Sequence, residues 1–137
     1  MGLILDSSLL IAGERRGQRV WDILERVRAS QGETESALCA VTVVELTHGI
    51  YRAKSEADAQ RRRAFVEELC RAIPVQPLTL EIARVAGRIE GEQAAKGIVI
   101  ALPDLLIGVT ALHLGYSVAT LNLRHFQLIP GLSIVHL

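Results

Sequence analysis

The sequence predicts an α/β fold built around a mainly parallel sheet. Short apolar runs typical of buried strands alternate along the 137 residues with longer segments of helical periodicity. One such segment, 103–114, is apolar almost all round, as expected for a helix covered on both sides. Half the residues are apolar, which is enough for a sizeable core. The length is close to about 150 residues per domain and no linker or repeat is visible, so we predict a single domain over 1–137.

The first quarter of the chain predicts one strand and two helices. Residues 2–5 are apolar and too few for a helix, so we expect a buried strand. Two serines then open a short helix over 7–12, and a charged turn follows at 13–17. Apolar side chains recur at helical spacing over 18–30, which indicates an amphipathic helix.

The middle of the chain repeats this alternation. Residues 37–41 predict the second strand, and Thr42 begins a helix with one apolar face. Ser55 caps a longer helix that exposes Arg61–Arg63. Residues 74–77 are bounded by prolines and predict a short edge strand, because proline cannot donate to a neighbouring strand.

The last part of the chain predicts two helices, near 78–96 and at 103–114, followed by strands at 117–121 and 132–135. Asp104 and Arg124 are separated by residues without a formal charge, over nearly the length of a membrane span. Gly115 is a helix stop that divides this run into a helix and a strand. We therefore interpret the run as buried core rather than as a membrane segment.

Charge and cysteine content narrow the function classes. Fifteen acidic residues balance fifteen basic ones, so simple coating of nucleic acid by excess positive charge is not expected. Aromatic residues make up 4%, which argues against binding mainly by base stacking. Cys39 and Cys70 have no metal-type spacing and are expected to be reduced core thiols of a cytoplasmic protein. The N-terminus carries no recognisable export signal.

Three acidic residues stand among apolar neighbours rather than among other charges. Asp6 ends the first predicted strand, Glu45 lies in the first turn of the helix after the second, and Asp104 lies in the first turn of the helix before residue 117. Ligands of open α/β sheets bind outside the carboxyl ends of the strands. We therefore expect the three carboxylates to meet at that end. Glu81 is set aside, because Arg84 and Arg88 place it on a polar helix face.

Each acid also has a purely structural interpretation. Asp6 suits a helix N-cap, and the segment from Thr42 to Glu45 matches a capping box. Asp104 follows Pro103 and complements a helix dipole. The functional interpretation depends on three separate acids pointing to one edge of the sheet.

Three gathered carboxylates indicate a hard divalent cation. They raise one another's pKa values, and Mg²⁺ or Mn²⁺ relieves this with oxygen ligands and retained waters. Such an ion activates water and stabilises charge on a phosphoryl oxygen, so the predicted chemistry is metal-dependent phosphodiester hydrolysis. The histidines show no zinc spacing, no phosphate-binding glycine loop is present, and the serines lack a nucleophile-elbow context.

Four segments in order resemble the motifs of PIN-domain nucleases, and most closely those of VapC-type toxins. They are Ile4-Leu5-Asp6-Ser7-Ser8-Leu9-Leu10, Val41-Thr42-Val43-Val44-Glu45-Leu46-Thr47-His48-Gly49, Leu102-Pro103-Asp104-Leu105-Leu106-Ile107-Gly108 and Thr120-x-Asn122-x-x-His125-Phe126. The likeness covers essentially the whole chain. It implies a three-layer α/β/α sandwich with a central parallel sheet and a ribonuclease that depends on Mg²⁺ or Mn²⁺.

The resemblance also implies roles for individual residues. Asp6 and Asp104 would be the principal metal ligands and Glu45 the third acid. Hydrogen bonds around the pocket would come from Thr120 and from Ser7 or Ser8. Family members commonly form homodimers and are inhibited by a VapB-type antitoxin. This sequence departs from many PIN domains at Asn122, where a fourth acid is usual. Asn122 can bind through a water but adds no charge, so we expect one tightly bound metal ion.

Arginines near these motifs are candidates for binding RNA phosphates. Arg15 and Arg16 follow the first predicted helix, and Arg124 follows Asn122. Solubilising surface charge explains them equally well. For Arg61–Arg63, a surface or partner role is favoured, because nothing in the sequence places them near the acids.

Two rival functions remain at this point. A phosphorylated receiver domain also clusters acids around Mg²⁺, but the strand near 73–76 lacks the required Asp, and Lys54 and Lys96 are misplaced. A PIN-like module without strong catalysis would act through dimerisation or by binding a partner or RNA. Metal bound between Asp6 and Asp104 would separate the catalyst from the binding module.

Overall fold

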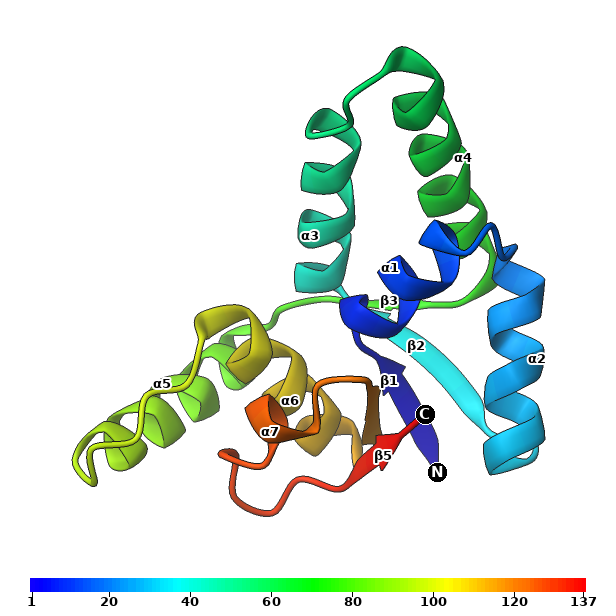
Figure 1. The fold of residues 1–137 in the computed structure, drawn as a ribbon. Helices are drawn as coiled ribbons and strands as arrows, with labels where there is room; N and C mark the ends of the chain where they lie inside the picture. Colours follow the sequence, from blue (N-terminus) through cyan, green and yellow to red (C-terminus); the bar gives the residue numbers. More distant parts are fainter.

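The computed structural model describes residues 1–137 and shows a parallel sheet with helices on both faces (Figure 1). The strands are β1 (Gly2–Leu5), β2 (Glu35–Cys39), β3 (Val75–Gln76), β4 (Ser117–Thr120) and β5 (Ile134–His136). The helices are α1 (Ser7–Arg15), α2 (Val20–Gln31), α3 (Ala40–Tyr51), α4 (Glu56–Ala72), α5 (Leu80–Ala94), α6 (Leu102–Leu114) and α7 (Leu123–Phe126). The predicted α/β fold with a sheet between helical layers is confirmed.

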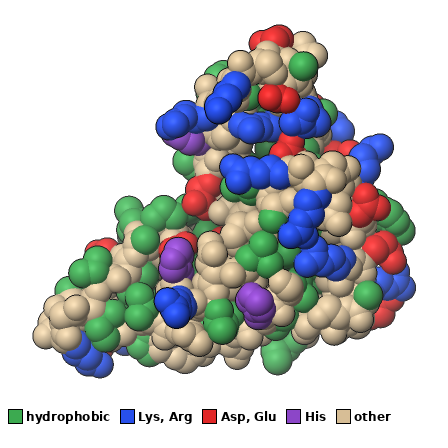
Figure 2. All heavy atoms as spheres, in the orientation of Figure 1, with side chains coloured by type: hydrophobic (Ala, Val, Ile, Leu, Met, Phe, Trp, Pro, Cys, Tyr) green, Lys and Arg blue, Asp and Glu red, His purple; other side chains and the backbone are tan.

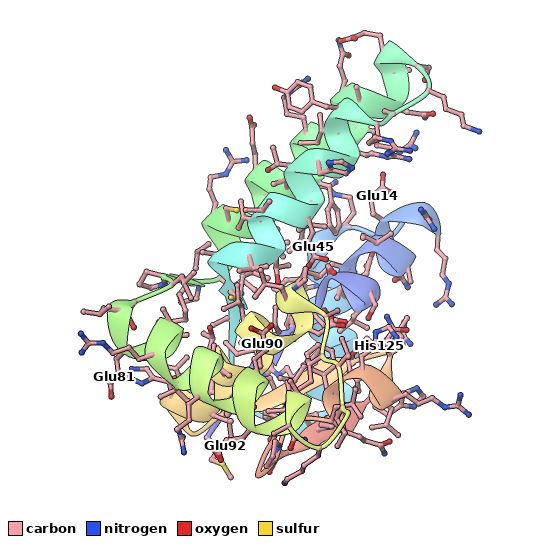
Figure 3. The ribbon with its side chains drawn as sticks, turned by 90° about the vertical axis from the view of Figure 1, so that its left-hand side faces the viewer. Glu14, Glu45, Glu81, Glu90, Glu92 and His125 are labelled. Carbon is pink, nitrogen blue, oxygen red and sulfur yellow. The ribbon has the colours of Figure 1, made fainter.

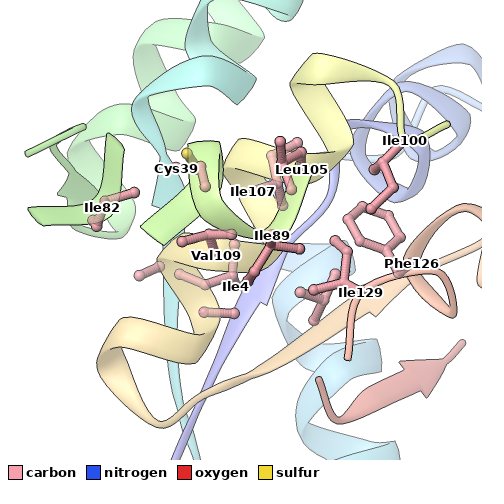
Figure 4. Close-up of a cluster of buried hydrophobic side chains, with 14 residues drawn as sticks. Ile4, Cys39, Ile82, Ile89, Ile100, Leu105, Ile107, Val109, Phe126 and Ile129 are labelled. Carbon is pink, nitrogen blue, oxygen red and sulfur yellow. The ribbon is translucent and has the colours of Figure 1, made fainter. Parts of the chain in front are cut away.

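The central strand β1 divides the core into two halves. The strand order is β3-β2-β1-β4-β5, and all neighbouring strands are parallel. Leu3 and Leu5 face α1, α2 and α4, whereas Ile4 faces the cluster formed with α5 and α6 (Figure 4). Every residue of β1 is buried, as expected for a strand covered on both faces.

The topology reverses direction at β1. The chain passes from β1 to β2 and β3 on one side and returns to β4 and β5 on the other. Crevices at such reversals are the usual ligand sites of open α/β sheets. Asp6 follows β1 and Thr120 ends β4, so both lie at this position. The α3–α4 hairpin projects beyond the same end of the sheet (Figure 1).

The first helix is longer than the sequence suggested, because Gly13 lies inside α1 rather than ending it. Gly13 is buried, and a Cβ atom there would lie 2.5 Å from Cδ1 of Ile23 on α2. The glycine therefore allows α1 and α2 to approach closely. The predicted turn begins only after Arg15.

The second strand lies two residues earlier than predicted. Glu35 and Ser36 pair with Gly2 and Leu3 despite their polarity, and α3 consequently begins at Ala40. Glu45 is thus in the second turn of α3, not the first. The Thr42–Glu45 capping box is also wrong, because the Thr42 hydroxyl is buried without a hydrogen-bond partner.

The uncharged run near the C-terminal end folds as predicted into α6 and β4. Gly115 ends α6 with a φ of 69°, a left-handed conformation that favours glycine. None of the helices combines the length and apolar character needed to cross a membrane. The short helix α7 was not predicted, and the last strand is Ile134–His136 rather than 132–135.

The long helix α4 is capped by Ser55, whose hydroxyl oxygen accepts the backbone N–H of Asp58 at 3.1 Å, as predicted. Phe65 and Leu69 form its buried face. Cys39 is a buried thiol, but Cys70 is exposed, so the prediction of two core thiols is wrong for Cys70.

Candidate active site

Asp6 is held at the carboxyl end of β1 by two hydroxyl groups. Its Oδ2 accepts hydrogen bonds from Ser8 Oγ at 2.7 Å and from Thr120 Oγ1 at 2.8 Å. The residue is 3% exposed and makes no side-chain capping bond to α1, although it occupies the N-cap position. Asp6 is thus the N-cap residue by position, but its side chain does not cap α1. Both hydroxyls donate to Oδ2, so Oδ1 remains for another partner.

Backbone groups orient these two hydroxyls. The N–H of Leu121 donates to Ser8 Oγ at 3.2 Å, and the N–H of Asn122 donates to Thr120 Oγ1 at 2.9 Å. Each oxygen accepts from the backbone and directs its own proton to Asp6. The segment after β4 thus fixes the orientation of the Asp6 carboxylate.

Glu45 points from α3 into the same region. Its Oε1 is buried without a hydrogen-bond partner. Burial is the main cause that raises the pKa of Glu45; the Ser7 hydroxyl opposes this, and the negative charges of Asp6 and Asp104 add to it. A buried carboxylate oxygen without a donor is costly. The site therefore favours a proton or a cation at Glu45.

Asp104 lies in the first turn of α6 and is partly buried. Burial raises its pKa, and the charge of Asp6 adds to this effect. His125 acts in the opposite direction, with its Nδ1 atom 3.3 Å from Asp104 Oδ2. Figure 3 shows Glu45 and His125 in this part of the molecule, whereas Glu81 and Glu92 lie on α5.

His125 is the residue that sequence reasoning missed. It belongs to α7, and the adjacent Phe126 is fully buried and anchors this short helix. The available signal was the Thr120-x-Asn122-x-x-His125-Phe126 segment, in which His125 is the only ionisable side chain besides Arg124. Thr120 contacts Asp6 and His125 contacts Asp104, so one segment supports two of the predicted acids.

The negative charge of Asp6 acts on both Glu45 and Asp104, but the three acids do not form a preassembled metal cage. The effects on the pKa values of Glu45 and Asp104 place Asp6, Glu45 and Asp104 in one neighbourhood. Nowhere in residues 1–137 are three or more His, Cys, Asp or Glu side chains arranged to hold a metal ion directly. The assignment of Asp6, Glu45 and Asp104 as metal ligands stays a prediction.

The remaining predicted residues lie around this neighbourhood. Asn122 precedes α7 and is exposed, as are Arg16 and Arg124. Arg15 lines a small cavity that Glu45 also lines. Arg62 lines the same cavity, which corrects the expectation that no residue of Arg61–Arg63 lies near the acids.

Comparison with known proteins identifies the family. The model of the PIN domain matches residues 3–131. The chain belongs to the PIN-domain family. Ribonuclease VapC1 of Rickettsia felis is 30% identical over 98% of this chain and 96% of its own. The tRNA(fMet)-specific endonuclease VapC of Salmonella typhimurium is 32% identical over 80% of this chain and 83% of its own.

Solved structures agree with this assignment. The crystal structure of DNA-bound VapBC from Salmonella typhimurium matches with a TM-score of 0.81 and 27% identity, covering 99% of this chain and 98% of that chain. The likeness to the VapC branch of the PIN-domain family, inferred from four segments, is confirmed.

The raised pKa values predict how the stability of this PIN domain depends on pH. In the unfolded chain Glu45 and Asp104 ionise near pH 4, whereas the folded protein holds both pKa values higher. The two protonated carboxyl groups therefore contribute fully to the free energy of unfolding below about pH 4. This contribution is lost as the pH rises through the pKa values of Glu45 and Asp104 in the folded protein. Without divalent metal, we expect the melting temperature of the wild type to fall relative to that of Glu45→Gln over this range. Parallel melting curves for the two proteins would contradict the prediction.

Proposed function

We propose that this PIN domain is an endoribonuclease that uses Mg²⁺ or Mn²⁺ to hydrolyse RNA phosphodiester bonds, and that it is the toxin of a toxin–antitoxin pair. The observation that carries the proposal is the buried, unpartnered oxygen of Glu45 beside Asp6 and Asp104. Relatives that share about a third of the sequence are named as ribonucleases, which supports the choice of RNA.

The side chains fit a hard divalent cation that keeps several waters. The available donors are carboxylate oxygens, and burial, together with the negative charge of neighbouring acids, raises the pKa values of Glu45 and Asp104. Mg²⁺ typically binds through one or two carboxylates and retains water, so a preassembled cage is not required. When bound, such an ion supplies stabilisation of negative charge on the phosphoryl oxygen and a more acidic water.

Each side chain then has a distinct role. Asp6 and Asp104 would hold the cation. Glu45 would bind at the same place through water and would accept a proton from the water that attacks the phosphodiester. Ser8 and Thr120 keep Asp6 oriented, which the hydrogen bonds to Oδ2 support. Ser7 stands beside Glu45.

Around this centre, Asn122 takes the place of a fourth acid and can bind through a water, which favours a single tightly bound ion. The exposed guanidinium groups of Arg16 and Arg124 are available to RNA phosphates.

The test is cleavage of a labelled single-stranded RNA by the purified protein. We expect cleavage with Mn²⁺ or Mg²⁺, none with EDTA, and none by Asp6→Asn protein that retains its melting temperature. Binding of Mn²⁺, followed by electron paramagnetic resonance, should be lost in the same variant. RNA binding without cleavage or metal uptake would instead favour the PIN-like module that acts by binding alone.

We also infer a protein partner of the VapB antitoxin class. The VapC of Salmonella typhimurium was solved within VapBC, which supports this inference. An arginine supplied by the partner would fit among Asp6, Glu45 and Asp104, because a guanidinium pairs well with carboxylates. Exposed Val44 and Tyr51 on α3 leave apolar surface for a homodimer. The proposed place of action is the cytoplasm, where RNA substrates are found.

A further inference from the structure

A small cavity of about 80 Å³ lies beside Glu45, between α1, α3 and α4. Its apolar wall comes from α1, α3 and α4. Its polar lining consists of Glu14, Arg15, Glu45 and Arg62, with the backbone of Gly49. Because Glu45 belongs both to this cavity and to the acidic neighbourhood, the two spaces are adjacent.

The two arginines of this cavity are not engaged in ion pairs, although the carboxylates of Glu14 and Glu45 line the same space. Arg62 is partly buried, and its Nη1 donates to the carbonyl oxygen of Gly49 at 2.7 Å, which ties α4 to α3. Neither Arg62 nor Arg15 forms an ion pair with a carboxylate. Glu14, by contrast, is paired with Arg61, whose Nε lies 3.2 Å from Glu14 Oε1.

Three consecutive arginines on α4 therefore have three different environments. Arg61 contacts Glu14 and Asp58. Arg63 stacks over the ring of Tyr51 at 5.9 Å and lines a separate hollow. Successive helical residues point about 100° apart, since one turn takes 3.6 residues. Only Arg62 is directed into the cavity next to Glu45.

We propose that this cavity binds one phosphate of the RNA substrate, held by Arg15 and Arg62. This phosphate is the neighbour, on the same strand, of the phosphate at which the strand is cleaved. The proposal rests on the proposed ribonuclease function. A strand whose scissile phosphate lies at Asp6 and Asp104 must place a neighbouring phosphate close by, and Glu45 borders both positions. Guanidinium groups suit phosphate because their planar fork donates two parallel hydrogen bonds.

The charge distribution of the chain supports this assignment. The formal net charge is zero, so binding of a polyanion depends on local patches. Figure 2 shows Lys and Arg side chains gathered where the α3–α4 hairpin meets the rest of the molecule. An arginine whose charge is already paired, such as Arg61, contributes less to a phosphate than an unpaired one.

The experiment measures binding without cleavage. Asp6→Asn protein in EDTA is titrated into a short fluorescein-labelled single-stranded RNA at several KCl concentrations, and affinity is followed by fluorescence anisotropy. A plot of log affinity against log salt has a negative slope, and the loss of one phosphate contact reduces the steepness of that slope by about 0.7 for single strands. We expect Arg62→Gln to make the slope shallower by this amount and to weaken RNA binding about tenfold. Arg15→Gln should act in the same direction with a smaller effect.

Arg63→Gln is the matched control, because it removes the same charge from the neighbouring position. We expect its salt slope to equal that of the Asp6→Asn protein, and we expect Arg62→Lys to restore most of the slope lost in Arg62→Gln.

Equal effects of Arg62→Gln and Arg63→Gln on RNA binding would overturn the proposed phosphate site. Unchanged RNA affinity in Arg62→Gln would overturn it as well. If Arg62→Lys and Arg62→Gln lose RNA affinity equally and both have a lowered melting temperature, Arg62 only stabilises the fold and does not bind phosphate. Absence of any RNA binding by the Asp6→Asn protein would overturn the proposed function as well.

Discussion

Asp104→Asn is expected to reduce metal-dependent RNA cleavage by more than about a hundredfold while the fold is retained. The substitution removes one of the two proposed principal ligands, and metal assistance contributes several kcal/mol to such reactions. It also removes a partly buried negative charge whose pKa is raised by burial and by Asp6. The melting temperature without metal should therefore hold or rise. Initial cleavage rates with Mn²⁺ and thermal melting curves measure the two effects.

The control for this experiment is Asp22→Asn on α2, which makes the same charge change at the exposed start of that helix. It should leave cleavage unchanged. Normal cleavage by Asp104→Asn protein would show that Asp104 takes no part in the reaction. Its role would then be to complement the dipole of α6.

Glu45→Gln is expected to lower cleavage by about tenfold to a hundredfold, the range found when a residue that supports a metal site is lost. Glutamine keeps the shape of the side chain but cannot accept a proton from the attacking water. Stability without metal should increase at neutral pH, because the Oε1 atom of Glu45 is buried without a donor and its ionised form is disfavoured. The neutral amide of glutamine lowers that cost, because no charge is buried.

Glu81→Gln serves as the comparison, since Glu81 is an exposed residue on α5 near His113. Neither activity nor stability should change appreciably there. A lower melting temperature for Glu45→Gln together with full activity would show that Glu45 stabilises α3 and takes no part in the reaction.

The sequence predicted the acid positions well because they depend on where strands end. Burial of the run at 2–5 and of β4 is a strong local signal, and the polar residues that follow such runs lie at one edge of a parallel sheet. Asp6 was located in this way. Thr120 was assigned from the resemblance to PIN-domain nucleases, and its hydrogen bond to Asp6 is present. Glu45 was placed in the first rather than the second turn of its helix, because the polar residues Glu35 and Ser36 pair with β1, so that β2 and α3 both begin two residues earlier than predicted.

Contacts between distant segments could not be predicted from local patterns. Gly13 lies within α1 because Ile23 packs against it, and no periodicity of α1 alone contains that information. The approach of His125 to Asp104 depends on how α7 turns after β4 and is anchored by Phe126. The direction of Arg62 depends on its bond to Gly49 on another helix. Each is set by packing between elements, which the order of residues encodes only indirectly.

The support given to Asp6 by the last residue of β4, and to Asp104 by α7, has a consequence during protein synthesis. Thr120 and His125 are translated long after Asp6, yet they hold the two acids in place. A nascent chain that ends before β4 lacks this support, and β1 lacks its neighbour on one side. Any nuclease activity that depends on these contacts would therefore begin only after nearly the whole domain has left the ribosome.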